Sequence, residues 1–390
     1  MSKRPGRRAV LMRHILAARA SRSLAYGALT VVLAEALAFR GFSPIGIGAA
    51  ITATLLTGAL TSALTGRLVR SFGARGTFAA GGAVMIVAAA LLAGDRPAIV
   101  CACLLGVVSP GGQDVGPFAA IEQAALADES ADVTRRLSVY NVISAAGVAF
   151  GALAAAALSY RDVLLLYAAA GAVVLLVAFA LHDGRETVAE PARQGRRAFG
   201  IVERLAALFA VDAFAGGFIV QAFIAYWFAH RFGVGPATIG PLLFGANVLA
   251  AASYLLAAHV AARIGLLNTM VFTHLPSNIL LCVLPFMPSF PLAAAVLLAR
   301  FALSQMDVPT RQAYTLSLVP RRDRARAAGV TAAVRPAAAS VAPVLTGIAF
   351  QFAAAGLPFV LAGVIKIAYD LSLLAMFRNV PVDGHEQTFT

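Results

Sequence analysis

Apolar runs recur along almost the whole chain, and they restrict the possible fold more than any other feature of the sequence. Most runs are roughly 20 residues long, the length at which an α-helix crosses the hydrocarbon core of a bilayer. Of the 390 residues, 60% are hydrophobic and only 13% are charged, whereas roughly a quarter of the residues of a soluble protein are charged. The sequence therefore predicts an all-α membrane protein.

Glycine, proline and charged residues divide the apolar sequence into twelve predicted transmembrane helices. The first six lie at about 15–38, 45–65, 77–93, 97–117, 137–159 and 162–181. The other six lie at about 203–229, 237–262, 267–286, 291–309, 327–350 and 356–377. The longest polar stretch separates the two sets. We therefore expect an N-terminal six-helix bundle at 1–181, a cytoplasmic linker at 182–200 and a C-terminal six-helix bundle at 201–390.

The basic residues predict the orientation of these spans. Segments assigned to the inside hold 22 Lys and Arg residues, and segments assigned to the outside hold only four. The four are Arg40, Arg96, Arg161 and Arg231. Because cytoplasmic loops carry the excess of Lys and Arg, we expect both termini in the cytoplasm and the chain in the inner cell membrane. The net charge of +13 is spread over short clusters, so we expect no nucleic-acid partner.

The two halves of the chain share residues at a nearly constant separation. Asp114 matches Asp307 and Ser138 matches Thr331, each 193 residues apart, and Gly73 matches Gly265, 192 residues apart. Parallel repeats of this kind are typical of transporters built from two bundles, whose substrate path lies between the bundles near the midplane. We therefore expect the two halves to be related six-helix bundles.

The loop between the second and third spans carries the clearest resemblance to a known family. Its sequence from Gly66 to Arg75 resembles the glycine and arginine signature of the major facilitator superfamily, although Arg70 stands where that signature has aspartate. The segment from Ser304 to Gln312 resembles a stretch of bacterial efflux-type permeases. With its six plus six spans, the chain resembles this superfamily over its whole length. The resemblance implies a monomeric secondary transporter of a small-molecule substrate, without a cofactor.

Ionisable side chains at membrane depth are the candidate functional residues, because each costs roughly 2.5–3.5 kcal/mol unless it has a partner or a water-filled cavity. The tenth span has the clearest set, a stripe at helical spacing on one narrow face. The stripe consists of Arg300, Ser304, Asp307 and Arg311. We expect it to line the central cavity, with Asp307 as its functional centre. The alternative is that Asp307 only neutralises Arg300 or an interfacial Arg311.

Other spans contribute further candidates for a substrate or proton site. They are Arg22 and Tyr26 on the first span, Asp114 and Glu122 on the fourth, Asp212 and Gln221 on the seventh, and Arg335 on the eleventh. Proline and glycine residues around Asp114 predict a loosened backbone there. The alternative to a site role is that Arg22 extends its side chain to the inner membrane interface and that Glu122 is an acid at the end of its helix, at the interface. Arg335, the deepest unpaired cation, would hold an anionic substrate or tie to Asp307 or Asp114.

Three further charged residues are expected to have structural roles only. Arg19 lies near the inner end of the first span, from which its long side chain would extend to the interface. Lys366 and Asp370 on the twelfth span are spaced i, i+4, so they are expected to neutralise each other.

The sequence contains no nucleotide-binding loop, nucleophile elbow or metal-ligand pattern, and the six histidines lie mainly near the ends of predicted spans. We therefore expect no enzyme and no bound metal, and a gradient would drive transport. The favoured hypothesis is proton-coupled efflux of small amphipathic organic molecules, with Asp114, Asp212 or Asp307 carrying the proton. Two alternatives stay open: a carrier of organic anions held by buried arginines, and a membrane sensor or lipid-handling protein without solute flux.

Overall fold

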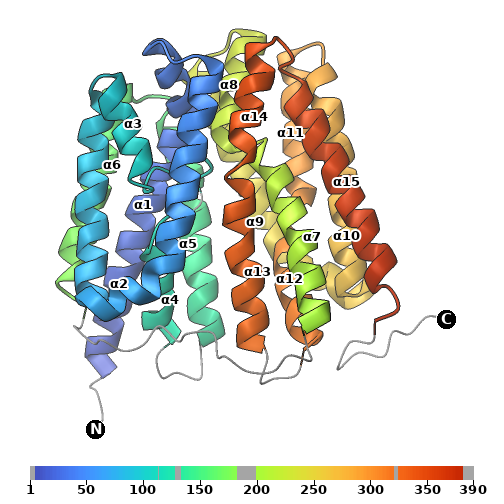
Figure 1. The fold of residues 1–390 in the computed structure, drawn as a ribbon, viewed down its shortest axis with the longest axis horizontal. Helices are drawn as coiled ribbons and strands as arrows, with labels where there is room; N and C mark the ends of the chain where they lie inside the picture. Colours follow the sequence, from blue (N-terminus) through green and yellow to red (C-terminus); the bar gives the residue numbers. More distant parts are fainter. Residues whose placement is uncertain (1–4, 113, 128–132, 182–198, 320–323, 381–390) are drawn as a thin grey trace. The chain divides into compact units, whose positions relative to one another are not determined.

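The computed structural model describes residues 5–112, 114–127, 133–181, 199–319 and 324–380, and every regular element in these ranges is a helix (Figure 1). The chain packs as two compact units. Unit 1 comprises the described residues up to 181 together with 220–244, and unit 2 comprises 199–219 together with the described residues from 245 onward. The predicted linker at 182–200 lies outside the described residues, except for its last two.

Both units pair their helices in the same way. Unit 1 contains α1 (Pro5–Phe39), α2 (Pro44–Ala93), α3 (Arg96–Leu104), α4 (Phe118–Ala127), α5 (Val133–Ala154), α6 (Tyr160–Ala178), α8 (Gln221–Phe232) and the start of α9 (Pro236–Ile264). Unit 2 contains the rest of α9 with α7 (Phe199–Gly217), α10 (Leu266–Val283), η1 (Leu284–Phe286), α11 (Phe290–Ser304), α12 (Asp307–Ser317), α13 (Arg324–Ala339), α14 (Ala342–Gln351) and α15 (Leu357–Phe377). α1 packs on α5 and α6 in unit 1, as α7 packs on α13 and α15 in unit 2.

α2 consists of two helices joined at Gly73. Its two ends lie together, because Arg96, just beyond α2, donates to the carbonyl oxygens of Arg40 and Gly41, which precede α2, at 2.9 and 2.6 Å. A 50-residue helix whose ends meet must reverse direction midway, and the ribbon of α2 turns back at its lower end (Figure 1). α2 therefore covers both the second and the third predicted spans.

The turn at Gly73 repeats in unit 2. Gly73 has φ 73° and ψ 163°, and Gly265, its match at the start of α10, has φ 83° and ψ 163°. Only glycine adopts this region of backbone space readily. The same rare conformation at two matched positions is independent support for the internal repeat.

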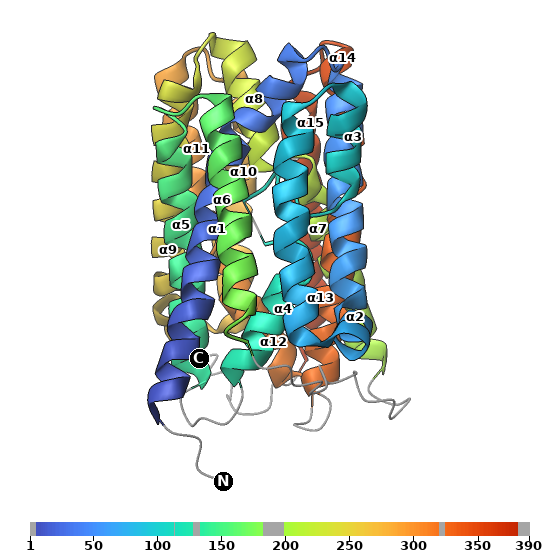
Figure 2. The same ribbon diagram turned by 90° about the vertical axis from the view of Figure 1, so that its left-hand side faces the viewer.

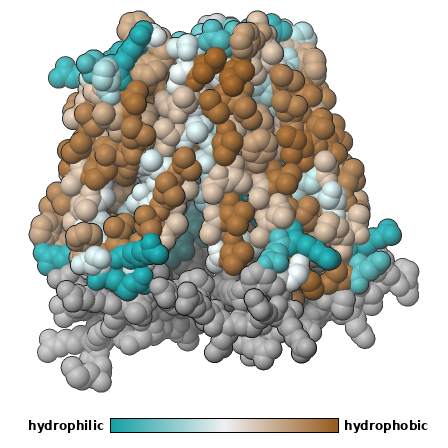
Figure 3. Space-filling view, in the orientation of Figure 1, coloured by the Kyte–Doolittle hydropathy of each residue, from teal (hydrophilic) through white to brown (hydrophobic). Residues whose placement is uncertain are grey.

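The lengths and surfaces of the helices make this a multi-pass membrane protein. Nine helices in the described part of the chain are long and apolar enough to cross a membrane. Large apolar side chains stay exposed along them, such as Leu165 at 60%, Leu176 at 68% and Leu255 at 75%. Figure 3 shows apolar side chains over the length of the helices and hydrophilic ones gathered near their ends. Contiguous apolar exposure on this scale requires lipid around it.

The fourth predicted span is not the continuous helix expected at 97–117. α3 ends at Leu104, and the described residues between it and α4 form no helix (Figure 2). The free carbonyl oxygens of this stretch accept hydrogen bonds from side chains: Tyr167 donates to Val107 at 2.6 Å, and Ser62 donates to Gly116 at 2.6 Å. Irregular backbone at membrane depth is tolerated where the protein satisfies it in this way. Hydropathy alone does not reveal such a break.

The seventh, tenth and eleventh predicted spans are interrupted too. The breaks fall between α7 and α8, between α11 and α12, and between α13 and α14. At the first of these, Thr346 donates to the free carbonyl oxygen of Phe218 at 2.9 Å. The polar stripe predicted on one straight helix is therefore divided, with Ser304 ending α11 and Asp307 beginning α12.

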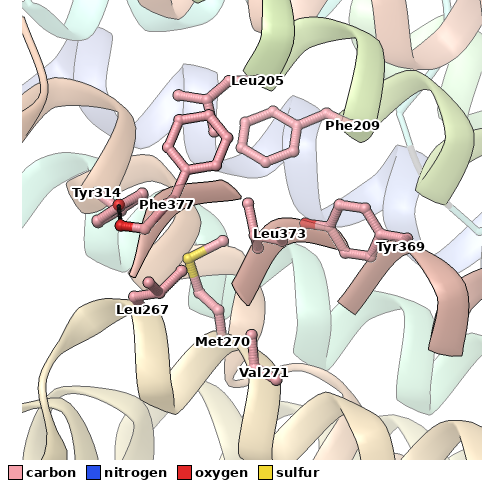
Figure 4. Close-up of a cluster of buried hydrophobic side chains, with 9 residues drawn as sticks. All are labelled: Leu205, Phe209, Leu267, Met270, Val271, Tyr314, Tyr369, Leu373 and Phe377. Carbon is pink, nitrogen blue, oxygen red and sulfur yellow. Dashed lines mark hydrogen bonds between the residues drawn. The ribbon is translucent and has the colours of Figure 1, made fainter. Parts of the chain in front are cut away.

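An apolar cluster joins four helices of unit 2 (Figure 4). Its members are Leu205 and Phe209 on α7, Leu267, Met270 and Val271 on α10, Tyr314 on α12, and Tyr369, Leu373 and Phe377 on α15. Tyr314 donates to the carbonyl oxygen of Phe377 at 3.4 Å. Asp212, His274 and Asp370 each follow a member of this cluster by one to four residues. The cluster therefore fixes the positions of α7, α10, α12 and α15, four of the helices that carry ionic side chains of unit 2.

Candidate functional site

Unit 1 buries four charged side chains that neutralise one another, here called the unit 1 network: Arg19, Arg22, Asp114 and Glu122. Arg22 on α1 is fully buried and donates to both oxygens of Glu122 on α4, at 2.8 and 2.7 Å. Asp114, in the irregular stretch before α4, lies 2.6 Å from Arg19 and 3.4 Å from Arg22. Tyr140 on α5 donates to Glu122 at 2.7 Å. Two cations thus balance two carboxylates, which buried charges require.

Aromatic rings complete the environment of the unit 1 network. The guanidinium of Arg22 lies 4.4 Å from the ring centre of Phe118, and that of Arg19 lies 4.5 Å from the ring centre of Tyr140. Such cation–π contacts stabilise a desolvated arginine. Tyr26 is buried one turn beyond Arg22, but within the described part of the chain its hydroxyl has no hydrogen-bond partner.

Gln221 lies at the start of α8, beside the irregular stretch of the fourth span. The backbone N–H of Ala222 donates to the carbonyl oxygen of Pro110 at 2.9 Å. A Cβ added to Gly112 would lie 3.6 Å from Oε1 of Gln221. The start of α8 and the irregular stretch after α3 therefore contact each other within unit 1.

Unit 2 buries a second and larger network around Asp212 of α7, here called the unit 2 network: Asp212, Asp307, Arg311, Arg335 and Lys366. The carboxylate oxygens of Asp212 lie 2.5 Å from Lys366, 2.9 Å from Arg335 and 3.5 Å from Arg311. Arg311 also pairs with Asp307, one turn earlier on α12, at 2.6 Å. The Arg335 side chain is 29% exposed, whereas the other four are between 3% and 8% exposed. Three helices thus bring cations to one carboxylate.

The unit 2 network is extended to α10 by His274. Nδ1 of His274 lies 2.8 Å from Oδ1 of Asp370, and Nε2 lies 4.0 Å from Oδ1 of Asp212. Asn278, one turn along α10, donates to Oδ2 of Asp370 at 2.9 Å. All of these side chains are buried. A continuous set of polar contacts therefore leads from Asp370 through His274 to Asp212.

Arg300 and Ser304 are both buried in the C-terminal half of α11. The guanidinium of Arg300 lies 5.2 Å from the ring centre of Phe301. Within the described residues, no carboxylate lies at ion-pair distance from Arg300, and its Nε has no hydrogen-bond partner. Ser304 is next to Gln305, whose amide lies 3.5 Å from the serine oxygen. Arg300 is thus a buried cation whose charge is not matched by a paired acid.

Comparisons with known proteins address the fold of the whole chain. No protein-family model matches the sequence. An uncharacterized membrane protein of Saccharomyces cerevisiae, YJR124C, is 24% identical over 92% of this chain and 92% of its own length. The crystal structure of the nucleoside transporter NupG superposes with a TM-score of 0.75 at 14% identity, over 94% of this chain and 99% of that one. The chain has the major facilitator superfamily fold.

Two further solved structures share the major facilitator fold. The D-xylose–proton symporter matches with a TM-score of 0.71 at 15% identity, over 96% of this chain and 98% of that one. The human organic anion transporter MFSD10 matches with a TM-score of 0.68 at 16% identity, over 95% and 100%. All three solved proteins are transporters. The fold expected from the resemblance to this superfamily is therefore confirmed.

Within this fold, the predictions for the first and fourth spans need correction. The side chains of Arg19 and Arg22 do not extend away from the protein, and Glu122 is not an exposed acid. All three are buried, because the irregular stretch after α3 brings Asp114 and Glu122 beside α1. The loosened backbone expected around Asp114 is confirmed.

The predicted pair Lys366–Asp370 is wrong. Both residues lie on α15, which packs on α7 and on α10. Lys366 contacts Asp212 of α7, and Asp370 contacts His274 of α10. The spacing i, i+4 permits a pair, but neighbouring helices offer each side chain a partner that the sequence does not reveal.

The partners of Arg335 and Arg311 also differ in part from the predictions. Arg335 pairs with Asp212 and with neither Asp307 nor Asp114. Arg311 pairs with Asp307, which was one of the predicted alternatives, but its side chain is buried in the protein and not exposed as an interfacial arginine would be. The reason is the interruption of the tenth span, since α12 begins at Asp307 and is itself buried over its first turns.

Sequence reasoning missed His274 and Asn278. The histidines were expected mainly near span ends, but His274 lies in the middle of α10 and is only 4% exposed. The signal was present, because a histidine and an asparagine four residues apart share one face of an apolar helix. In the described part of the chain, no group of three or more potential metal ligands is found.

Proposed function

We propose that the chain is a secondary transporter, not an enzyme, which carries a small organic solute across the membrane by alternating access. The fold supports this, because the solved proteins that share it transport nucleosides, xylose with protons, or organic anions. The sequence has no nucleotide-binding loop, so the proposed driving force is an ion or solute gradient. The inner cell membrane, with both termini in the cytoplasm, remains the proposed location.

The observation that carries the proposal is the unit 2 network. A structural ion pair needs one cation for one carboxylate, yet Asp212 has three cationic neighbours on three helices. Burying so many charges contributes little to stability, because their desolvation offsets their mutual attraction. Charges retained inside a membrane protein are typical of substrate and ion pathways. We therefore infer that the unit 2 network has a transport role.

The finer proposal is proton-coupled efflux of small amphipathic molecules, with Asp307 as the proton carrier. Asp307 has one cationic partner, Arg311, which also lies 3.5 Å from Asp212. A proton on Asp307 would remove its charge, and Arg311 would then be attracted to Asp212 alone. Proton binding would thus change the contacts between α12 and α7. Asp114 and Asp212 are less suited to this role because each has two or more cationic neighbours.

The experiment that tests Asp307 uses Asp307→Asn, which keeps the shape of the side chain and removes the titratable charge. A coupling role predicts normal yield of folded protein, loss of accumulation driven by a pH gradient, and retained solute exchange. Asp95→Asn is the matched control, because Asp95 caps α3 at an exposed position and asparagine caps equally well. Normal yield with unchanged gradient-driven flux would contradict the coupling role. Poor yield would indicate that Asp307 is a structural partner of Arg311.

A carrier of organic anions is the second candidate, and two observations favour it. Among the described residues of unit 2, the buried cations Arg300, Arg311 and Lys366 and the partly exposed Arg335 stand against three buried carboxylates (Asp212, Asp307 and Asp370). Arg335 is also the member of the unit 2 network most open to solvent. A guanidinium can hold a carboxylate by two parallel hydrogen bonds. Arg335→Gln is therefore expected to reduce transport of anionic test solutes and to leave that of cationic ones unchanged; equal losses of both would exclude this candidate.

A further inference from the structure

Asp370 differs from the other buried carboxylates in the described part of the chain, because no arginine or lysine lies at ion-pair distance from it. Its contacts are with His274, 2.8 Å away, and with the amide of Asn278, 2.9 Å away. Asp370 is 1% exposed, His274 4% and Asn278 0%. A buried carboxylate needs a cation or a proton to compensate its charge. Here the compensating group is itself a titratable one.

The hydrogen-bond roles identify the atom of His274 that gains a proton. An ionised carboxylate only accepts, so Nδ1 of His274 carries the hydrogen that points to Asp370. Nδ2 of Asn278 also lies 3.2 Å from this Nδ1, and in this arrangement it donates to Oδ2 of Asp370 and not to the imidazole. In the neutral imidazole, Nε2 then has no hydrogen and presents a lone pair. Nε2 lies 4.0 Å from Oδ1 of Asp212. A lone pair facing a carboxylate is repelled, whereas an N–H group of a charged imidazolium at the same place is attracted.

We infer that His274 and Asp370 form a proton-binding site, separate from Asp307, in which Nε2 of His274 takes up the proton and presents it to Asp212. Before uptake the pair holds one proton, on Nδ1. After uptake it holds two, on Nδ1 and Nε2, and the proton comes from water without any other bond forming or breaking. Imidazole is the side chain whose ordinary titration falls nearest to physiological pH.

The surroundings of His274 determine what its protonation does. The charged and titratable groups on the helices around it include Asp212 on α7, Arg300 on α11, Asp307, Arg311 and Tyr314 on α12, and Lys366, Tyr369 and Asp370 on α15. A protonated His274 brings a fourth cation to Asp212. Of the three cations that now contact Asp212, Arg335 is the most exposed, at 29%. Water can therefore replace its contact with Asp212 at the lowest cost in free energy. Protonation of His274 therefore weakens the hold of Asp212 on Arg335.

The consequence for transport rests on the proposed function. If the chain is a proton-coupled transporter, Arg335 becomes available to an acidic group of the solute when His274 is protonated. Proton uptake at His274 and binding of an anion at Arg335 would then support each other, because the anion offsets the added positive charge. The proton site itself is independent of any solute, and it is tested without one.

The test is an NMR titration of protein labelled with ¹³C at the imidazole ring, purified in detergent without solute through a tag that lacks histidine. The chain has six histidines, and His274→Gln, or His274→Asn if the first variant folds poorly, identifies the resonance of His274 by its loss. The site predicts that this resonance moves as the pH of the sample is lowered. In Asp370→Asn the resonance is expected to lose most of this movement, because the stabilising carboxylate is gone.

The control is His259→Gln, since His259 is exposed on α9; it should leave the titration of His274 unchanged. A His274 resonance that does not move with pH would overturn the proton site, and so would an unaltered titration in Asp370→Asn. These outcomes do not depend on transport. Separately, loss of pH-driven flux in His274→Gln would support the coupling to transport, whereas unchanged flux with a titrating His274 would overturn that coupling and leave the transporter proposal intact.

Discussion

Arg22 shows how strongly a single residue can depend on its partners. It is fully buried, and it contacts both Glu122 and Asp114. Removing it leaves two buried carboxylates with only Arg19 to balance them. Breaking a buried ion pair at one partner typically costs about 3–5 kcal/mol. We therefore expect Arg22→Met to lower the melting temperature and the yield of monodisperse protein markedly.

The matched control for Arg22→Met is the double variant Arg22→Met with Glu122→Leu. It removes both members of the pair and leaves Arg19 with Asp114, so the charges stay balanced. Apolar replacement of a complete buried pair is often neutral or stabilising. The double variant should therefore be more stable than the single one in a thermal melt. A single variant as stable as the wild type would contradict the description of this network.

Lys366 provides a test of the partners that the structure assigns on α15. Groups in direct contact typically have an interaction energy of about 0.5–3 kcal/mol in a double-mutant cycle. We expect an energy in this range between Lys366→Met and Asp212→Asn, because the two side chains lie 2.5 Å apart. The cycle of Lys366→Met with Asp370→Asn should give a clearly smaller energy. Stability measured by thermal melts decides between them, and the reverse ranking would restore the i, i+4 pair.

At the level of single residues, the sequence showed which ionisable side chains cost free energy at membrane depth, but not which of them form ion pairs with each other. Every ionisable candidate was visible as a charge inside an apolar run. The partner of Arg22 depends on the irregular stretch after α3, and the partner of Lys366 depends on how α15 packs between two helices. Both depend on contacts between residues about 100 or more positions apart, which a periodic pattern does not encode.

At the scale of elements, the packing of α1 on α5 depends on small residues. A Cβ at Gly151 would lie 2.0 Å from the carbonyl oxygen of Leu24, too close for any real contact. Close approach through glycine is a common way for membrane helices to associate. Gly151→Ala should therefore push the two helices apart, at a cost of about 1–3 kcal/mol for overpacking, and lower the melting temperature.

Gly329→Ala is the control for the substitution at the contact between α1 and α5. Gly329 lies on α13, and a Cβ there would have no atom within 4 Å. Alanine favours a helix over glycine by about 1 kcal/mol, so this variant should melt at the same temperature as the wild type or slightly above it. Equal melting temperatures for the two variants would show that the α1–α5 contact is looser than described.

The positions of the helices were largely predictable from the sequence. Of their interruptions, the loosened backbone around Asp114 was expected, whereas the breaks in the seventh and tenth spans were not. Runs of apolar residues indicated the positions of the spans, because a helix that crosses a bilayer must be apolar and about 20 residues long. The breaks in the fourth and seventh spans leave backbone carbonyl oxygens without a hydrogen-bond donor from their own helix. Hydroxyl groups of other helices, such as those of Tyr167 and Thr346, donate to these oxygens instead. That compensation is visible only once the helices are packed.

For the whole molecule, the positive-inside prediction gives a direct test of topology. Ser71, beside the turn in α2, and Arg161, at the start of α6, are both exposed and belong to opposite predicted sides. In a background without the three cysteines, Arg161→Cys should react with an impermeant maleimide in intact cells. Ser71→Cys should react only after the membrane is opened. Labelling of Ser71→Cys from outside would reverse the orientation.

The internal repeat has a chemical asymmetry. At the separation of 193 residues that relates Asp114 to Asp307, Arg19 of α1 corresponds to Asp212 of α7. The first helix of unit 1 therefore brings cations to acids, whereas the matching helix of unit 2 brings an acid to cations. The unit 1 network is balanced, and the unit 2 network has three cations for two carboxylates. This asymmetry is the reason to look for the coupling chemistry in unit 2.

Proton-coupled transport through Asp307 is tested most directly by measuring solute-driven proton movement in proteoliposomes. The proteoliposomes contain a pH-sensitive dye and start without a pH gradient. Nucleosides, pentoses and aromatic organic anions are added from outside, since these cover the solute classes of solved proteins with this fold. The account predicts that at least one class changes the internal pH, and that Asp307→Asn abolishes the change while Asp95→Asn retains it. Folded, reconstituted protein that moves neither solute nor protons above the level of protein-free liposomes in all three classes would contradict it.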